Sequence, residues 1–140
     1  MSRGDKVKAW FWRWWPALMM MALIFGASSL SKNELPNFGT WDLLGKKGGH
    51  VLGYTLLGSA YLRGLSASRR LTWRLAVLAL AGATLYAVTD EFHQLFVSGR
   101  TSSPVDVLID TGGAAAGIAA WTLIQTRVRP AWPRPPSTPR

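Results

Sequence analysis

The stretch AVLALAGATLYAV, residues 76–88, decides the fold class of this chain. It contains no charged side chain, and its two polar residues do not form a stripe. A helix on the surface of a soluble bundle would show polar residues at i, i+3 and i+4 opposite its apolar face. The stretch therefore favours a membrane-spanning helix over a helix of a soluble bundle.

Three further apolar runs resemble this one in length. The four predicted spans are Trp14–Leu30, about Gly48–Leu65, about Leu71–Phe92 and Val105–Gln125. Each is near the ~20 residues that cross a ~30 Å hydrocarbon core, provided that Arg63 and Arg74 extend to the interface. The sequence predicts an all-α integral membrane bundle of four transmembrane helices.

The first span is entered through AWFWRWW, whose tryptophans are typical of an interfacial aromatic belt. We expect Pro16 in the first turn of this helix. The predicted organisation is a basic aromatic segment over residues 1–13, a transmembrane domain over 14–125 and a Pro/Arg-rich disordered tail over 126–140. The arginines of the tail would attract anionic lipid head groups.

Charge is distributed unequally between the two predicted sides of the membrane. One side has twelve basic residues: Arg3, Lys6, Lys8, Arg13, Arg63, Arg69, Arg70, Arg74, Arg127, Arg129, Arg134 and Arg140. The other has only Lys32, Lys46, Lys47 and Arg100, with the acids Glu34, Asp42, Asp90, Glu91, Asp106 and Asp110. By the positive-inside rule, both termini are predicted to be cytoplasmic.

The net charge and the N-terminal segment each allow another interpretation. A net charge of +9 would suit nucleic-acid binding, but the charges lie outside the apolar runs and no nucleic-acid motif is present, so no nucleic-acid partner is expected. The start KVKAWFWR with its apolar run and the small residues 26–28 also fits a secretory signal peptide. The other three spans would then keep their orientation. The absence of cysteine excludes disulfides and thiolate metal sites.

Polar residues gather at the ends of three predicted helices on the acidic side. In KKGGHVLGY, residues 46–54, the side chains of Lys47, His50 and Tyr54 fall on one helix face. In TDEFHQLFVSGRTSSPVD, residues 89–106, Asp90 and Gln94 are spaced i, i+4. Asp106 and Asp110 have the same spacing on the last helix. These faces are predicted to meet at one level of the membrane.

Asp110 lies about 6 Å deeper along its helix than Asp106. A lone carboxylate at the bilayer centre costs roughly 2.5–3.5 kcal/mol, so Asp110 should be protonated or face a partner inside the bundle. Lys47, His50 and Arg100 are the candidate partners.

The sequence around Asp110 also predicts how its helix begins and packs. Residues 102–104, SSP, supply a predicted N-cap and first turn. Below the acids, GAAAG at 113–117 predicts the close approach of a neighbouring helix.

KGGHVLGY (47–54) and DEFHQLFVSGRTSSPVDVLIDTGGAAAG (90–117) together resemble the VanZ-like family of small bacterial membrane proteins. The matching positions are Lys47, His50, Tyr54, Asp90, Glu91, Gln94, Gly99, Arg100, Asp106, Gly113 and Gly117. The chain departs from the family pattern at Lys46, Ser98 and Asp110, where Asp, Pro and Asn are usual. The resemblance implies a multi-pass protein of the bacterial cytoplasmic (inner) membrane. The family's namesake is associated with low-level resistance to the glycopeptide teicoplanin.

The polar residues suggest an enzyme or binder acting on an envelope lipid or glycolipid, such as a polyprenyl phosphate. Arg100 and Lys47 could hold a phosphate, and His50 or Glu91 could act as general base. Asp90 and Asp106 would orient the base or hold a divalent cation. The candidate catalytic residues are His50, Glu91, Asp90 and Asp106, and the candidate substrate-binding residues are Lys47, Arg100, Gln94, Tyr54 and Asp110. The sequence leaves any metal or cofactor open.

Three alternatives remain at this point. The cluster could only lock the helices together, because buried polar groups must be paired. The chain could be an accessory protein of the envelope, or Asp110, Asp106, Glu91 and His50 could form a proton or ion relay. The sequence also leads to predictions for two single residues. His93 is expected to be a loop residue, and Tyr54 is expected either to donate a hydrogen bond to an acid or to anchor at the interface.

Overall fold

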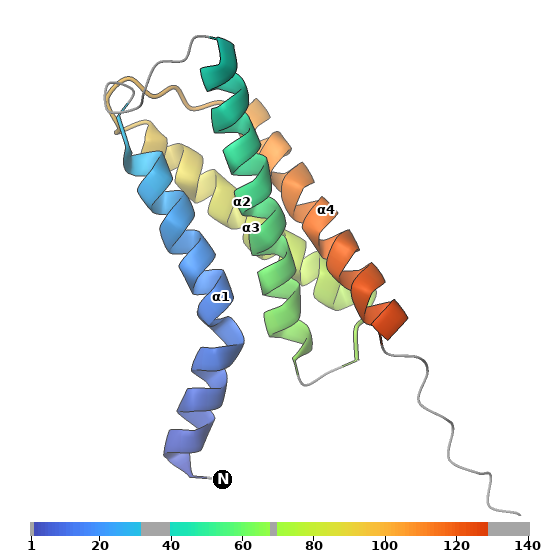
Figure 1. Ribbon diagram of the computed structural model, residues 1–140. Coiled ribbons are helices and arrows are strands. Elements are labelled where there is room, and N and C mark those ends of the chain that lie inside the picture. Colours follow the sequence, from blue (N-terminus) through green and yellow to red (C-terminus); the bar gives the residue numbers. More distant parts are fainter. Residues whose placement is uncertain (1, 32–39, 68–69, 129–140) are drawn as a thin grey trace, which may run out of the picture.

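The computed structural model describes residues 2–31, 40–67 and 70–128, with only the backbone described at 40–46 and 128. The described chain forms four helices and no strand: α1 (Arg3–Ser29), α2 (Thr40–Ser66), α3 (Trp73–Gln94) and α4 (Pro104–Val128) (Figure 1). The all-α prediction is confirmed. The expectations for Lys32, Glu34, Asp42, Lys46, Arg69 and residues 129–140 lie outside the described side chains, while α4 continues through residues 126–128.

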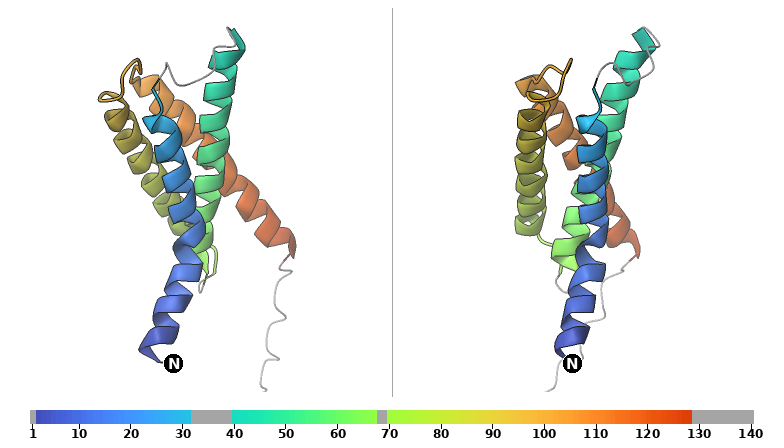
Figure 2. Two further views of the ribbon diagram at one scale, coloured as in Figure 1. Left: turned by 60° about the vertical axis from the view of Figure 1, so that its left-hand side comes forward. Right: turned by 90° about the vertical axis from the view of Figure 1, so that its left-hand side faces the viewer.

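The four helices alternate in direction along one bundle (Figures 1 and 2). The end of α1, the start of α2, the end of α3 and the start of α4 therefore lie at the same end of the molecule, the upper end in Figure 1. Within the described residues, α2 and α3 each pack against the other three helices, whereas α1 and α4 do not pack against each other. This topology brings together the helix ends that carry the predicted polar faces.

Helix α1 begins well before the predicted span. Ser2 caps its N-terminus, and Pro16 lies inside the helix, so the expectation that Pro16 occupies the first turn is wrong. Because proline has no N–H, the carbonyl of Trp12 loses its helical partner. Arg63 of α2 donates hydrogen bonds to the carbonyl oxygens of Trp12 (3.5 Å) and Arg13 (3.1 Å). An interhelical contact therefore replaces the bond that the proline removes.

Arg13 forms the reverse contact, from α1 to the last turn of α2. Its guanidinium donates to the carbonyl oxygens of Gly64 and Leu65. The last carbonyls of a helix have no partner within the helix, and a cation near them is also favoured by the helix dipole. The two arginines therefore join α1 and α2 at the end of the bundle opposite the polar cluster.

Two helices are long and apolar enough to cross a membrane: Trp73–Gln94 and residues 104–127 of α4. Among the described residues, α1 and α2 do not reach the same hydropathy. Charged residues, tryptophans and serines lower the mean hydropathy of α1, and glycines and polar residues lower that of α2. Both still expose large apolar side chains, including Leu23 of α1 (58% exposed) and Leu52 of α2 (61% exposed).

Helices α2 and α4 approach each other most closely at glycines. A Cβ atom on Gly113 would lie 2.8 Å from the carbonyl oxygen of Val51, and one on Gly117 would overlap the carbonyl of Thr55. The hydroxyl of Ser59 lies 2.9 Å from the carbonyl oxygen of Gly117. The GAAAG stretch thus allows the predicted close approach, and the neighbouring helix is α2.

Replacing Gly117 with alanine should destabilise the bundle, because the added methyl group overlaps backbone that cannot move independently. We expect Gly117→Ala to cost roughly 1–3 kcal/mol, the range for overpacking a tight interface. The measurement is thermal unfolding in detergent. Gly112→Ala is the matched control, since a Cβ there meets nothing within 4 Å. Equal stability of the two variants would contradict the packing described here.

Candidate functional site

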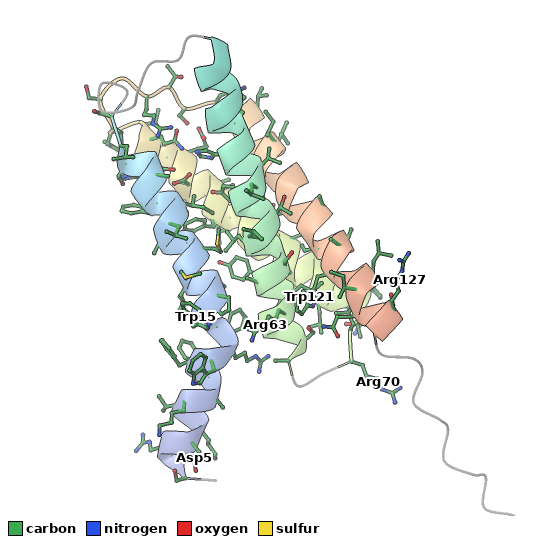
Figure 3. All side chains as sticks on the ribbon, in the orientation of Figure 1. Asp5, Trp15, Arg63, Arg70, Trp121 and Arg127 are labelled. Carbon is green, nitrogen blue, oxygen red and sulfur yellow. The ribbon has the colours of Figure 1, made fainter. Side chains whose placement is uncertain are left out.

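Nitrogen and oxygen atoms of side chains gather between the helix ends at one end of the bundle, away from the labelled Asp5 and Arg127 (Figure 3). They come from the end of α1, the start of α2, the end of α3, the start of α4 and the loop between α3 and α4. The adjacent end of α1 was not part of the predicted cluster.

Two side-chain pairs join α2 to α4. Lys47 Nζ lies 3.3 Å from Asp106 Oδ1, and one turn deeper His50 Nδ1 lies 3.3 Å from Asp110 Oδ2. Asp110 is 1% exposed, so its carboxylate depends on this partner. Of the three candidate partners for Asp110, the structure selects His50.

The contact with Asp110 also orients the imidazole of His50. An ionised carboxylate can only accept a hydrogen bond, so Nδ1 carries the proton when it faces the ionised Asp110. In the neutral imidazole, Nε2 is then the proton acceptor. His50 and Asp110 therefore have the relative placement of a base and the group that orients it.

Asp90 belongs to a separate buried cluster between α1 and α3. Ser28 Oγ donates a hydrogen bond of 2.8 Å to Asp90 Oδ2, and Gln94 Nε2 lies 3.3 Å from the same oxygen. Asp90 is 2% exposed, and its Oδ1 has no hydrogen-bond partner among the described residues. Sequence reasoning missed Ser28, because a single serine near the end of an apolar run gives no signal of its own.

Glu91 fixes the start of α4, at the end of the loop between α3 and α4. Its Oε2 accepts a hydrogen bond of 3.0 Å from the backbone N–H of Ser103. Ser103 directly precedes Pro104, the first residue of α4, and its Oγ accepts from the N–H of Val105 (3.2 Å). The expected start of this helix at SSP agrees with these bonds.

Arg100 connects the loop between α3 and α4 to the end of α1. Gly99 precedes it with a φ of 74°, a left-handed conformation that glycine adopts without steric strain. The Arg100 guanidinium donates from Nη2 to the carbonyl oxygen of Ala27 (2.7 Å) and from Nε to that of Leu30 (3.2 Å). Helix α1 has no basic residue in its own last turn. Arg100, which lies in the loop between α3 and α4, therefore supplies the positive charge at the C-terminal end of α1.

The expectations for Tyr54 are both wrong. Tyr54 is fully buried, and its hydroxyl has no hydrogen-bond partner among the described residues. It therefore neither donates to an acid nor anchors at the interface. Its ring stacks near His50, with 6.3 Å between the ring centroids. Tyr54 supports His50 by packing.

His93 lies in the last turn of α3, and the expectation that it is a loop residue is wrong. Its ring stacks on Phe25 of α1, with 4.5 Å between the centroids, and its Nε2 lies 3.1 Å from Ser29 Oγ. These contacts give His93 a packing role between α1 and α3.

A cavity of about 240 Å³ lies among these groups. Its lining includes seven of the nine predicted site residues: Lys47, His50, Glu91, Gln94, Arg100, Asp106 and Asp110. Gly99, Thr101 and Ile109 complete the lining, and Asp90 and Tyr54 are not part of it. Among the side chains that the structure describes, no group of three or more His, Asp or Glu residues is placed to hold a metal ion.

The fold defines a class, the helical bundles with two helices long and apolar enough to cross a membrane, here with a polar cavity at one end of the bundle. The model of one family, VanZ/LLP1, matches residues 11–125, and the chain belongs to this family. The resemblance found in the sequence motifs is confirmed. No curated protein and no solved structure matched the chain.

Removing the side-chain hydroxyl should change the stability of the bundle differently at two tyrosines. Tyr86 donates a hydrogen bond of 2.6 Å to the carbonyl oxygen of Met21, so Tyr86→Phe should cost about 1 kcal/mol of stability. Tyr54→Phe removes a buried hydroxyl without a partner and should leave stability unchanged or raise it. Thermal unfolding of both variants in one detergent tests this. A larger loss for Tyr54→Phe would show that its hydroxyl has a partner.

Proposed function

We propose that this chain is a four-span protein of the bacterial inner membrane whose end cavity binds the head group of an envelope lipid. The head group would belong to a phospholipid, a glycolipid or a polyprenyl phosphate. The observation that carries the proposal is the 240 Å³ cavity beside the paired charges. A cluster that only locked helices together would have no need of this space.

The cavity lining suits a head group with both anionic and hydrogen-bond-donating parts. Lys47 offers a point charge for a phosphate, and its side chain is about half exposed. Arg100 has five N–H donors, and its two contacts with α1 carbonyls leave further donors for a second group. Glu91 and Asp106 can accept hydrogen bonds from sugar hydroxyls or from an amine. This mixture of charges favours a phosphate accompanied by hydroxyl or amino groups.

Four spans are supported by the exposed faces of the helices. Helices α3 and α4 meet the length and hydropathy of a span. Helix α1 exposes leucine, methionine and phenylalanine, and α2 exposes Val51, Leu52 and Leu56. The described basic residues assigned to the end opposite the cavity are Arg3, Lys6, Lys8, Arg13, Arg63, Arg70, Arg74 and Arg127. By the positive-inside rule that end faces the cytoplasm, and the cavity faces the outer side.

A second candidate function is acid–base chemistry on the bound head group. The 3.3 Å contact between His50 Nδ1 and Asp110 favours it, because this contact directs the proton-accepting Nε2 away from the carboxylate. His50 would act as general base toward a water molecule or a head-group hydroxyl. Glu91 is the alternative base.

A link to glycopeptide resistance is part of the proposal. It is supported by membership of the VanZ/LLP1 family, because the namesake of the VanZ-like family is associated with low-level teicoplanin resistance. A protein that binds envelope lipid head groups at the outer side could change how the envelope presents itself to a drug.

Filling the cavity should remove bound lipid without unfolding the bundle. Ile109 lines the cavity, whereas the adjacent Leu108 is 71% exposed and is not part of the lining. We expect purified Ile109→Trp to lose phospholipid or polyprenyl species that wild type and Leu108→Trp retain, as measured by mass spectrometry of bound lipids. Equal retention by all three, at equal folded yield, would favour a cluster that only locks the helices.

The orientation can be tested with single cysteines, because the chain contains none. Ser98 lies in the loop next to the cavity and Ala67 follows α2 at the other end, and both are exposed. A membrane-impermeant thiol reagent should label Ser98→Cys in intact spheroplasts and Ala67→Cys only after permeabilisation. The opposite pattern would place the cavity on the cytoplasmic side.

A further inference from the structure

A second, apolar groove runs between α1 and α2, with a volume of about 370 Å³. It is lined by α1 side chains between Met20 and Leu30 and by α2 residues between Gly49 and Leu56. Almost all of its lining is hydrocarbon. The groove is distinct from the polar cavity, which lies among α2, the end of α3, α4 and the loop between α3 and α4.

The two spaces meet at the same two residues. His50 and Arg100 line both the polar cavity and the apolar groove, and no other residue is shared between their linings. Both residues are held in place, His50 by Asp110 and Arg100 by the carbonyls of α1. A molecule that filled both spaces would therefore have its polar part on one side of this pair and its apolar part on the other.

The groove has the length of one lipid chain in one leaflet. Met20 and Leu30 are ten residues apart on α1, which corresponds to about 15 Å along the helix axis. This is half of the ~30 Å hydrocarbon thickness. The groove also faces outward, because Leu23 and Leu52 on its two walls are more than half exposed.

We infer that the α1–α2 groove holds a hydrocarbon chain of the same lipid whose head group occupies the polar cavity. This inference rests on the proposed function and deepens it. The lipid enters sideways from the outer leaflet, with its chain between α1 and α2 and its phosphate at Arg100. The bound class is thus a long-chain membrane lipid with an anionic group close to the start of its chain, and soluble sugars or phosphates are excluded.

Energetics favour this route over entry from water. Drawing a chain out of the bilayer into a polar space exposes methylene groups at a large cost for each. A groove of leucine and methionine is as apolar as the lipid tails it replaces, so the chain moves into it without that cost. The head group can then reach the cavity while its chain stays in apolar surroundings.

Adjacent glycines give a matched pair of variants for the test. Gly49 lines the groove, Gly48 lines neither space, and a Cβ atom at either meets nothing within 4 Å. Both positions therefore accept a Cβ atom without a clash, and both substitutions raise helix propensity equally. Gly49→Leu narrows the groove, and Gly48→Leu does not.

The experiment is photo-crosslinking in nanodiscs that contain phosphatidylglycerol with a diazirine on its acyl chain. In the wild type and in Gly48→Leu, adducts should concentrate on residues 20–30 and 49–56. In Gly49→Leu these adducts should fall several-fold. Adducts spread evenly over all outward helix faces, or undiminished in Gly49→Leu, would overturn the inference, because they would indicate ordinary boundary lipid.

Ile109→Trp separates a failure of this inference from a failure of the proposed function. If both hold, filling the polar cavity also lowers the groove adducts. If adducts stay in the groove of Ile109→Trp at wild-type level, the groove binds chains without the cavity, which contradicts the inference that one lipid fills both. If Ile109→Trp loses lipid and Gly49→Leu does not, only the groove assignment is wrong.

Discussion

The pairing of Asp110 with His50 is the contact on which the rest of the site depends. A buried carboxylate in an apolar surrounding must find a hydrogen-bonding partner, and this one finds it on the neighbouring helix 3.3 Å away. The glycines at 113 and 117 make that distance possible, because they let α4 approach the backbone of α2. The α2–α4 interface therefore provides both the close packing of the two helices and the partner of the buried carboxylate.

The remaining polar contacts extend from this interface toward α1. Glu91 fixes the start of α4 through Ser103, and the left-handed Gly99 turns the loop so that Arg100 meets the end of α1. Each of these contacts joins two segments that are distant in sequence. The charged residues are thus held at the edge of a space that they do not fill.

Several features could be predicted from the sequence because they depend on local patterns. The helical class follows from apolar runs without a polar stripe, and the contact of α4 with a close neighbour follows from the spacing of small residues. The helix faces carrying Lys47, His50, Asp106 and Asp110 follow from the helical repeat. The residues of the α2–α4 pairs can therefore be predicted from the sequence alone.

Other features could not be predicted because they depend on which segments meet in three dimensions. Ser28 becomes a partner of Asp90 only through the packing of α1 on α3. The sequence does not show that two N–H groups of Arg100 are directed to the backbone of α1, which leaves only its remaining donors for a phosphate. Pro16 was placed at a helix start because the sequence does not show that Arg63 satisfies the carbonyl it frees. Tyr54 was expected to donate to an acid or to anchor at the interface, because the sequence does not show that its side chain is fully buried in the core.

The most direct test of the central claim is an experimental structure of the protein in a lipid bilayer. We expect a lipid head group in the cavity, within hydrogen-bond distance of Lys47 and Arg100, and Asp110 still paired with His50. A cavity filled by side chains of the protein, or Asp110 turned away from His50 toward lipid, would contradict it.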